Sequence, residues 1–499
     1  MNKQIRRLAL GLLVCYVILF VQLNIIQVGR EQALMADVRN NRLTTRDFNR
    51  PRGPIVTADG TIIAQSVPSP GGAYKYQRVY PTNDLFANVT GYYTFGYGST
   101  QLEKTQDAVL MGDTDAQKLK AISGLFRGEN TGSVVLTLRH DVQQLAAQQI
   151  GDREGSAVVL DPKTGAVLAM VNNPRFNPND IAGVPTKKAG EVLTLLNLNP
   201  SKPLLDRTYQ ERYMPGSAFK VITTATALSE GVTSLERSWP SEKAWTPPQT
   251  TKPVGNYGGS SCGGTMAEVF YRSCNIPFAQ MAIELGPGRM VNGTKAWGIG
   301  EKVPIDLPAP AASYFGDAAN FTQNLPLLAI GGFGQGDDTM VPMQMAMVAA
   351  TVANGGVMMK PYVIAASLAH DGSVLTQTTP EAWKTPISAE VATTLTTLMI
   401  GVVNQGTGRQ MQLANGVQAA AKTGTAQLFS DGPEKSNAWI IGFAPADSPR
   451  YAVAVMLKGG VNDEISAGTG GKLAGPIAKV LLDHLLATET PAAPPASAP

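Results

Sequence analysis

Residues 155–172 read GSAVVLDPKTGAVLAMVN, in which two apolar runs flank the segment Asp-Pro-Lys-Thr-Gly. Pro and Gly favour tight turns, and short apolar runs bounded by such residues favour strands. The stretch therefore predicts a β-hairpin with antiparallel strands. Its turn exposes Lys163 to solvent, so we expect this Lys-Thr-Gly triplet to be structural.

The residues after this hairpin show further helix and strand patterns. Helices are expected after Pro215, around 267–285, from Pro342 to a capping Gly355 and over 476–486, and strands around 419–428, 437–445 and 450–459. This order has no strict alternation of strands and helices, so it favours an antiparallel sheet with helices packed on it over a parallel sheet. We predict an α+β domain over 155–487, followed by a Pro/Ala-rich, disordered tail over 488–499.

The preceding residues, 29–154, form a region of mixed character. A hairpin is expected over 49–66, with its turn at 58–60, and a strand followed by a helix over 133–150. At 499 residues the chain is too long for one ordinary hydrophobic core. We therefore predict that 29–154 is a separate N-terminal domain.

The first residues have the composition of a membrane anchor. Lys3, Arg6 and Arg7 precede an apolar stretch, 8–28, whose few polar residues lie near its end. About 20 apolar residues span a bilayer, and flanking basic residues stay on the cytoplasmic side. We expect a cytoplasmic tail over 1–7, a single transmembrane helix over 8–28 and export of the rest of the chain. A cleaved signal peptide is the alternative.

Charge and histidine content exclude several classes of protein. A formal net charge of +3 argues against a dedicated nucleic-acid binder. The three histidines, His140, His370 and His484, lie in unrelated contexts, and the sequence lacks His-Glu-x-x-His and Cys-x-x-Cys motifs. A zinc hydrolase or a serine-histidine triad is therefore disfavoured. We expect neither a metal nor a cofactor.

Two of the three cysteines are expected outside the membrane. Cys15 lies inside the anchor, whereas Cys262 and Cys274 lie in the exported region, where disulfides persist. A bridge between these two would close a short loop. Two free, buried thiols are the alternative.

Ser217 and Lys220 form the only Ser-x-x-Lys motif of the chain, in RYMPGSAFKVITTATAL (212–228). Pro215 and Gly216 favour a helix start, and residues three apart lie on one helical face. A serine hydroxyl becomes a good nucleophile only when a base removes its proton, and lysine can be that base only when its amine is neutral. An isolated match of this kind is usually an exposed helical lysine.

Two further motifs follow. Ser273-Cys274-Asn275 is the only Ser-x-Asn; alone it reads as a helix cap and a turn, but its hydroxyl could relay a proton and its amide could hold a substrate amide. The second Lys-Thr-Gly, at 422–424, is followed by Thr425 and preceded by alanines. Glycine lets another backbone approach closely, and Lys and Thr can bind a carboxylate. For this triplet alone a turn would be favoured.

The three motifs occur in the order found in serine β-lactamases and penicillin-binding proteins. The stretches RPRGPI (50–55), YGSTQLEKTQDAVLMG (97–112), GFGQGDDTMVPMQMA (332–346) and NAWIIGFAPAD (437–447) extend the likeness. On these residues the chain closely resembles class B penicillin-binding proteins, which are monofunctional peptidoglycan transpeptidases. The resemblance implies a β-lactamase-like transpeptidase domain with helices on both sides of its sheet, behind an elongated, non-catalytic pedestal.

The resemblance also implies roles for individual residues. Ser217 would be the acyl-forming nucleophile and Lys220 its general base. Ser273 would shuttle the proton, and Asn275 would bind the peptide amide. Lys422, Thr423 and Thr425 would hold the terminal carboxylate of D-Ala-D-Ala beside Gly424. The backbone N–H groups of Ser217 and Thr425 would form the oxyanion hole.

Several alternatives and partners follow from the resemblance. A class A β-lactamase would carry a deacylating Glu in a Glu-x-x-Leu-Asn-like stretch, which is absent between Ser273 and Lys422. A bifunctional penicillin-binding protein would need a glycosyltransferase domain, for which 30–150 is too short. A non-catalytic β-lactam sensor or scaffold and a D,D-carboxypeptidase remain open. Expected partners are stem peptides, their lipid-linked precursor, β-lactams and a SEDS-family glycan polymerase in the membrane.

Overall fold

A computed structural model describes residues 3–26, 47–69, 71, 74–118, 130–428, 435–459 and 468–488. It divides into two compact units, one formed by Met1–Pro51 with Ser66–Gln77 and one by Arg52–Gln65 with Arg78–Pro499. The domain boundary at residue 155 falls inside the second unit and stays a prediction. The expected tail lies outside the described residues from 489 onward.

The first unit contains α1 (Lys3–Asn24), a helix of 22 residues without acidic residues in its first turn or any buried side chain. At 1.5 Å per residue it is about 33 Å long, enough to cross the hydrocarbon layer of a bilayer. By length and composition it is the one helix among the described residues that could do so. Residues 27 and 28, at the end of the predicted span, lie outside the described part.

The second unit is built on a five-stranded antiparallel sheet, which contains the hairpin predicted at residue 155. Its strand order is β17-β18-β19-β7-β8, and the strands are β17 (Ala420–Leu428), β18 (Lys435–Ala444), β19 (Tyr451–Leu457), β7 (Gly155–Leu160) and β8 (Val167–Asn173). The register pairs Val158 with Met170 in the hairpin and Ala454 with Val158 across β19 and β7. The sheet therefore joins strands from both ends of the predicted catalytic domain.

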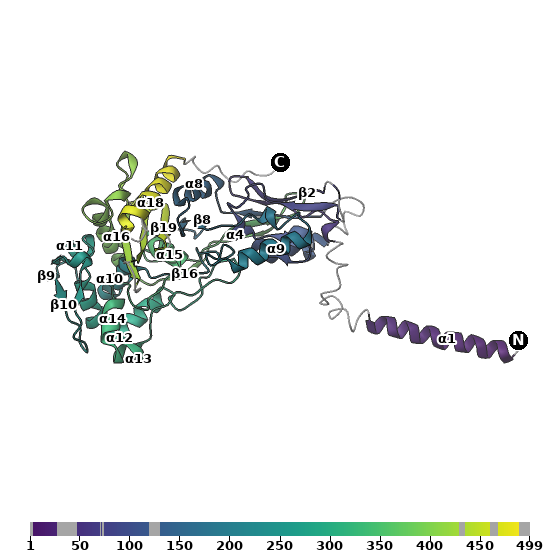
Figure 1. Ribbon diagram of the computed structural model, residues 1–499, viewed down its shortest axis with the longest axis horizontal. Coiled ribbons are helices and arrows are strands. Elements are labelled where there is room, and N and C mark those ends of the chain that lie inside the picture. Colours follow the sequence, from purple (N-terminus) through teal and green to yellow (C-terminus); the bar gives the residue numbers. More distant parts are fainter. Residues whose placement is uncertain are drawn as a thin grey trace. The chain divides into compact units, whose positions relative to one another are not determined.

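Both faces of this sheet are covered by helices, as predicted. Successive strand residues point to opposite faces. Val158 and Met456 belong to the core shared with α15 (Pro342–Ala353), and Val159 and Val455 to the core shared with α8 (His140–Ile150) and α18 (Gly470–Ala487). Figure 1 shows α8 and α18 together over the sheet. Strands buried on both faces explain the nearly continuous apolar runs of the sequence.

A second sheet combines segments that are distant in the sequence. In it β15 (Val374–Gln377), β14 (Ile364–Leu368), β6 (Ser133–Leu136), β1 (Ile55–Val56) and the Ile62–Gln65 part of β2 (Ile62–Pro68) lie side by side in that order. The antiparallel β1–β2 pair confirms the hairpin predicted over 49–66. Because β14 pairs with β6, residues of the predicted catalytic domain complete a sheet of the predicted N-terminal domain.

The remaining described elements are shorter or form the helical part of the second unit. They are β3 (Tyr76–Val79), α4 (Ala87–Thr90), β4 (Tyr93–Thr94), β5 (Gly98–Ser99), α5 (Gln101–Thr105), α6 (Asp107–Met111), η2 (Pro178–Asp180), α9 (Thr186–Leu198), η3 (Gly216–Phe219), α10 (Lys220–Ser229), β9 (Ser238–Glu242), β10 (Ala244–Trp245), β11 (Val254–Gly255), η4 (Tyr257–Gly259), β12 (Cys262–Thr265), α11 (Met266–Tyr271), α12 (Ile276–Ala296), α13 (Ala318–Gln323), α14 (Leu325–Gly331), β13 (Met358–Met359), β16 (Ala382–Lys384), α16 (Ala389–Asn404), η5 (Arg409–Met411) and η6 (Ala414–Gly416).

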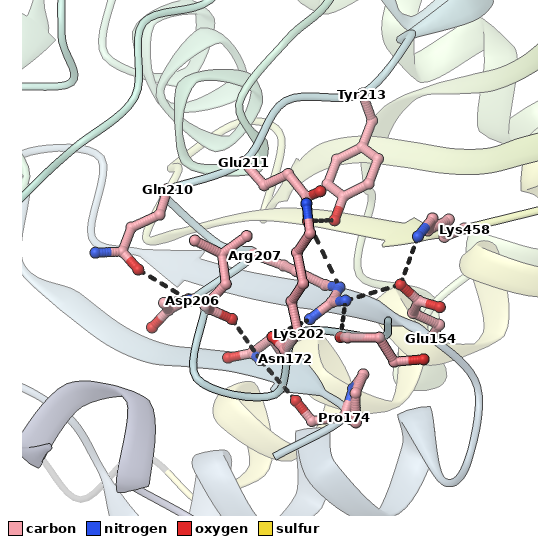
Figure 2. Close-up of polar contacts among 12 residues, drawn as sticks. Glu154, Asn172, Pro174, Lys202, Asp206, Arg207, Gln210, Glu211, Tyr213 and Lys458 are labelled. Atoms are coloured by element: carbon pink, nitrogen blue, oxygen red, sulfur yellow. Dashed lines mark hydrogen bonds and ion pairs between the residues drawn. The ribbon is translucent and has the colours of Figure 1, made fainter. Parts of the chain in front are cut away.

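A buried polar network anchors the segment that leads to Ser217. Figure 2 shows the Glu154 carboxylate between Arg207 and Lys458, with N···O distances of 2.8 and 2.7 Å. Glu154 precedes β7 and Lys458 follows β19, so the network also ties together the ends of two neighbouring strands. The Asp206 carboxylate accepts the Thr208 backbone N–H at 2.8 Å, and burial raises the pKa of Asp206 to about 7.

Candidate active site

Ser217 lies in η3, a 3₁₀ helix of one turn that directly precedes α10. Gly216 adopts φ +53°, and its N–H donates to the Gly334 carbonyl at 2.9 Å. A Cβ on Gly216 would come within 2.5 Å of the Thr425 carbonyl oxygen. Glycine at this position therefore allows the turn that carries Ser217 to rest on the backbone of β17.

Lys220 is completely buried below this turn. Its Nζ donates to the Ser273 carbonyl at 2.8 Å, to the Cys274 carbonyl at 2.7 Å and to Asn275 Oδ1 at 2.9 Å. Among the hydrogen bonds of the described residues none joins Lys220 to Ser217. The lysine thus connects α10 to the Ser-x-Asn segment rather than to solvent.

The Ser-x-Asn segment is a turn, so the prediction of one helix around 267–285 is wrong. Helix α11 ends at Tyr271, α12 begins at Ile276, and Ser273 adopts φ +59° between them. A left-handed residue interrupts a helix, and Pro277 suits the first turn of the next one. The break points the Ser273 hydroxyl and the Asn275 amide at Lys220.

A disulfide and an asparagine hold this turn in place. Cys262 on β12 is bonded to Cys274, with their Cα atoms 5.6 Å apart. The buried Asn256 accepts the Asn275 backbone N–H at 2.8 Å, and the Asn275 side chain donates to the Gly255 carbonyl at 3.1 Å. The Gly-rich loop over 252–264 is therefore attached directly to the residues that flank Ser273.

Lys422 of β17 approaches Ser273 from the opposite side. Its Nζ donates to Ser273 Oγ at 2.9 Å, and Lys220 Nζ lies 3.3 Å from the same oxygen. The Ser273 hydroxyl thus lies between two buried amines that are about 200 residues apart in the sequence. A hydroxyl both donates and accepts, so it can pass a proton between them.

Burial lowers the pKa of both amines, so each holds a proton less tightly than an exposed lysine does. Desolvation and then the nearby charge of Lys422 hold the pKa of Lys220 well below its ordinary value. Desolvation alone lowers the pKa of Lys422 to about 7. Near neutral pH the site can therefore hold a neutral amine, as a general base requires.

The rest of the second triplet is fixed by its neighbours. Thr423 Oγ1 lies 2.6 Å from Thr407 Oγ1, and Thr425 Oγ1 accepts the Gly470 backbone N–H at 3.4 Å. A Cβ on Gly424 would be 2.5 Å from the Pro215 carbonyl oxygen, so this glycine lets β17 lie against the Ser217 turn. The first triplet, in contrast, lies in the exposed turn between β7 and β8, where Lys163 N–H donates to Asp161 at 2.8 Å.

A cavity of about 660 Å³ opens above these residues. Its lining includes all four hydroxyls of the predicted site, in Ser217, Ser273, Thr423 and Thr425, and the Asn275 amide, while Lys220 and Lys422 lie beneath it. Its other lining residues are Gly255, Asn256, Tyr257, Gly258, Gly259, Arg272, Phe333, Gln335, Thr407, Gln427, Thr469 and Gly471. The three sequence motifs therefore meet at one pocket.

Among the polar lining residues that sequence reasoning missed, three contact the predicted motifs or the strand that carries the second triplet. Asn256 fixes the Ser-x-Asn turn, Thr407 contacts Thr423, and Gln335 contacts the end of β17. Gln335 belongs to the stretch 332–346 that carries the family resemblance, and Asn256 lies in the Gly-rich loop, but neither side chain shows a local signal of its role. Thr407 follows α16 and carries no local signal, because only the folded chain brings it to β17.

Comparisons with known proteins agree with this geometry. Residues 155–483 match the model of the penicillin binding protein transpeptidase domain, and residues 52–135 match that of the penicillin binding protein A dimerisation domain. The peptidoglycan D,D-transpeptidase PbpA of Mycolicibacterium smegmatis is 37% identical, over 97% of this chain and 98% of the relative. The PbpA of Mycobacterium tuberculosis is 34% identical, over 98% and 100%.

Solved structures give the same result. An imipenem acyl-enzyme complex of penicillin-binding protein A from M. tuberculosis superposes with a TM-score of 0.80 at 32% identity, covering 88% of this chain and 100% of that one. Its penicillin G acyl-enzyme complex gives a TM-score of 0.79 at 33% identity, with the same coverage. Within class B, the size of the chain, its Ser-Cys-Asn motif and its tail favour actinobacterial penicillin-binding protein A, in agreement with these relatives.

Proposed function

Because the chain belongs to the family of penicillin-binding protein transpeptidases and is a peptidoglycan D,D-transpeptidase, we propose that Ser217 is the nucleophile that forms its acyl-enzyme. The donor is the D-Ala-D-Ala end of a stem peptide, and β-lactams acylate the same hydroxyl. The observation that carries this assignment is the Ser273 hydroxyl within 3.3 Å of two buried amines, directly below the Ser217 turn.

In this mechanism Lys220 is the general base for Ser217. The depressed pKa of Lys220 supports this role, because only a neutral amine can take the serine proton. The catalytic contact between Ser217 and Lys220 forms when substrate is bound, as such contacts often tighten only then. The backbone N–H groups of Ser217 and Thr425 stabilise the oxyanion that develops on the scissile carbonyl.

Ser273 then transfers the proton to the leaving D-alanine, and Asn275 holds the peptide amide. The contacts of Ser273 Oγ with Lys220 and Lys422 support a relay through this hydroxyl. Lys422, Thr423 and Thr425 bind the terminal carboxylate beside Gly424. When an acceptor amine replaces the leaving group, the same relay runs in reverse and the cross-link forms.

The enzyme works at the membrane surface in this proposal. Residues 8–28 form a single-pass anchor after a cytoplasmic tail over 1–7, and the catalytic domain, 155–487, is extracytoplasmic. The length and apolar composition of α1 support the anchor. The pedestal, 29–154, engages a SEDS-family glycan polymerase that supplies strands made from the lipid-linked precursor.

Mass spectrometry after penicillin treatment tests the nucleophile. We expect one penicilloyl adduct on Ser217, no adduct in Ser217→Ala, and normal labelling in the matched control Ser448→Ala, which changes an exposed serine. An adduct on another serine would refute the assignment.

A second assay separates a transpeptidase from the alternatives. The enzyme should join a lipid-linked donor to an acceptor amine and release D-alanine. A β-lactam sensor would be labelled but release no D-alanine, and a carboxypeptidase would release D-alanine without forming a cross-link.

A further inference from the structure

The outer edge of β17 carries a row of backbone groups that face away from β18. Alternate residues of a strand direct their N–H and C=O to the same side. Gln427 directs both groups to the Gln335 side chain, and the Thr423 carbonyl accepts from Lys422 Nζ at 3.1 Å. Thr425, midway between them, must have the same orientation, and it lines the active-site cavity.

The Gln335 carboxamide makes the two bonds that a residue of a neighbouring strand would make. With the amide oriented as the facing Gln427 N–H and C=O require, its NH₂ group donates to the Gln427 carbonyl at 3.2 Å, and its oxygen accepts the Gln427 N–H at 3.0 Å. Antiparallel strands pair through the same exchange of one N–H and one C=O. The Gln335 side chain therefore pairs with the backbone N–H and C=O of Gln427. The corresponding backbone groups of Thr425 remain on the side of the cavity.

Gln335 is held on a stiff loop that is connected to the nucleophile turn. Its N–H donates to the Ile330 carbonyl at 3.1 Å, and the side chain is only 8% exposed. Gly334 and Gly336 on either side adopt φ +76° and +84°. A Cβ on Gly334 would overlap the Gly216 carbonyl, so this loop and the Ser217 turn form one packed unit.

The direction of the donor peptide decides what lies at Gln427. If the proposed function holds, the terminal carboxylate lies near Lys422 and Thr423, and the acylated residue pairs with Thr425. The peptide then runs antiparallel to β17, and the residue two positions before the acylated one reaches Gln427, because strand pairing repeats every two residues. Gln335 already occupies that position.

We infer that Gln335 closes the donor groove at Gln427 and is a specificity-determining residue. Backbone pairing of the donor stops at Thr425, so the enzyme recognises the D-alanyl end and is indifferent to the backbone further upstream. This allows one site to accept stem peptides whose upstream linkages differ from those of an ordinary peptide strand.

The test compares two donors in the full-length protein in detergent. One is N-acetyl-D-Ala-D-Ala, and the other carries two more ordinary residues between the acetyl group and D-Ala-D-Ala. We expect wild type to be acylated by both at the same rate, measured by D-alanine release and mass spectrometry. In Gln335→Ala the longer donor should react roughly tenfold faster than the shorter one, the effect of about two added neutral hydrogen bonds.

Two variants and one label separate the outcomes. Gln335→Glu keeps the side-chain length and can accept from Gln427 N–H but cannot donate, so it should show the same preference, only weaker. Gln377→Ala, on β15 of the other sheet, should behave as wild type. Penicillin labelling of Ser217 verifies folding of each variant, and if Gln335→Ala loses it, the Glu variant carries the test.

Two results would overturn the inference. Either wild type already prefers the longer donor, so that Gln335 swings aside, or neither Gln335 variant gains a preference, so that Gln335 merely protects the strand edge. Absence of penicillin labelling in wild type would instead refute the proposed function.

Discussion

The Ser273 hydroxyl contacts two buried amines, and this arrangement makes each lysine dependent on the other. A positive charge on Lys422 disfavours one on Lys220, since like charges in a dry site repel. Because neither buried amine holds a proton easily, the Ser273 hydroxyl gives that proton a path from one amine to the other. Substitutions of the two lysines should therefore change different properties of the reaction and not only slow it by different factors.

Lys220→Arg keeps the positive charge but should abolish base catalysis. Arginine cannot be deprotonated in proteins, so acylation by penicillin should fall by about 10²–10⁴-fold. The time course of the Ser217 adduct measures the loss, and the melting temperature checks that the larger side chain is tolerated. Near-normal acylation would mean that Lys220 acts only through its charge.

Lys422→Ala should slow acylation by carboxylate-bearing substrates by roughly 10- to 100-fold, as expected for a lost charged hydrogen bond. Removal of the Lys422 charge also raises the pKa of Lys220, so the base loses its proton at higher pH. The rising limb of the pH–rate profile should therefore move to higher pH. Lys163→Ala, in the exposed turn, is the matched control and should match wild type in both rate and profile.

At the scale of helices and strands, the sequence predicts those elements that are determined by residues close together in the chain. The hairpin at 155–172 follows from its Pro and Gly, and α18 follows from its apolar face. The break between α11 and α12 does not, because 267–285 is apolar enough for one helix. The left-handed Ser273 is stabilised by contacts with distant residues, namely the disulfide to Cys262 and the hydrogen bonds from Lys220 and to Asn256. Pocket residues such as Thr407 are missed for the same reason: β17 reaches them only after folding.

The disulfide joins the Gly-rich loop to the turn that carries Ser273. In the chain-entropy model a loop of this length contributes about 2–4 kcal/mol to the free energy of unfolding. Reduction should lower the melting temperature by a few degrees and slow acylation, because the turn is then less well held. Thiol titration of the unfolded, unreduced protein in a Cys15→Ser background should find no free thiol. Two thiols would contradict the bridge.

The buried Asp206 should make stability depend on pH. Its pKa is about 7 in the folded chain and close to 3.8 when unfolded, so between these values the folded state holds the extra proton. The free energy of unfolding should then decrease as pH rises from about 4 to 7, by roughly 1.4 kcal/mol per pH unit from this group.

Asp206→Asn keeps an oxygen for the Thr208 N–H and removes the titration. We expect the variant to melt at a higher temperature than wild type at pH 7, with the difference shrinking toward pH 4. Parallel melting curves at all pH values would show that Asp206 does not titrate in this range.

At the scale of the whole molecule, the anchor and the chemistry should be separable. All predicted catalytic residues lie in the second unit, whereas α1 belongs to the first. Deletion of residues 1–28 should move the protein from the membrane fraction to the soluble fraction. Penicillin acylation of Ser217 should stay within about twofold of the full-length rate, and a larger loss would mean that the anchor shapes the site.

The strand order of the main sheet has a consequence for biogenesis. Its middle strand, β19, is made last of the five, and it pairs with β7, which was made almost 300 residues earlier. A chain that has been made only as far as β18 lacks the central strand that joins the β7–β8 pair to the β17–β18 pair. The pocket that Ser217 lines also includes Thr469 and Gly471, which follow β19, so it is incomplete until almost the whole chain has been made, and the unpaired edges of β7 and β18 are prone to wrong pairing until then.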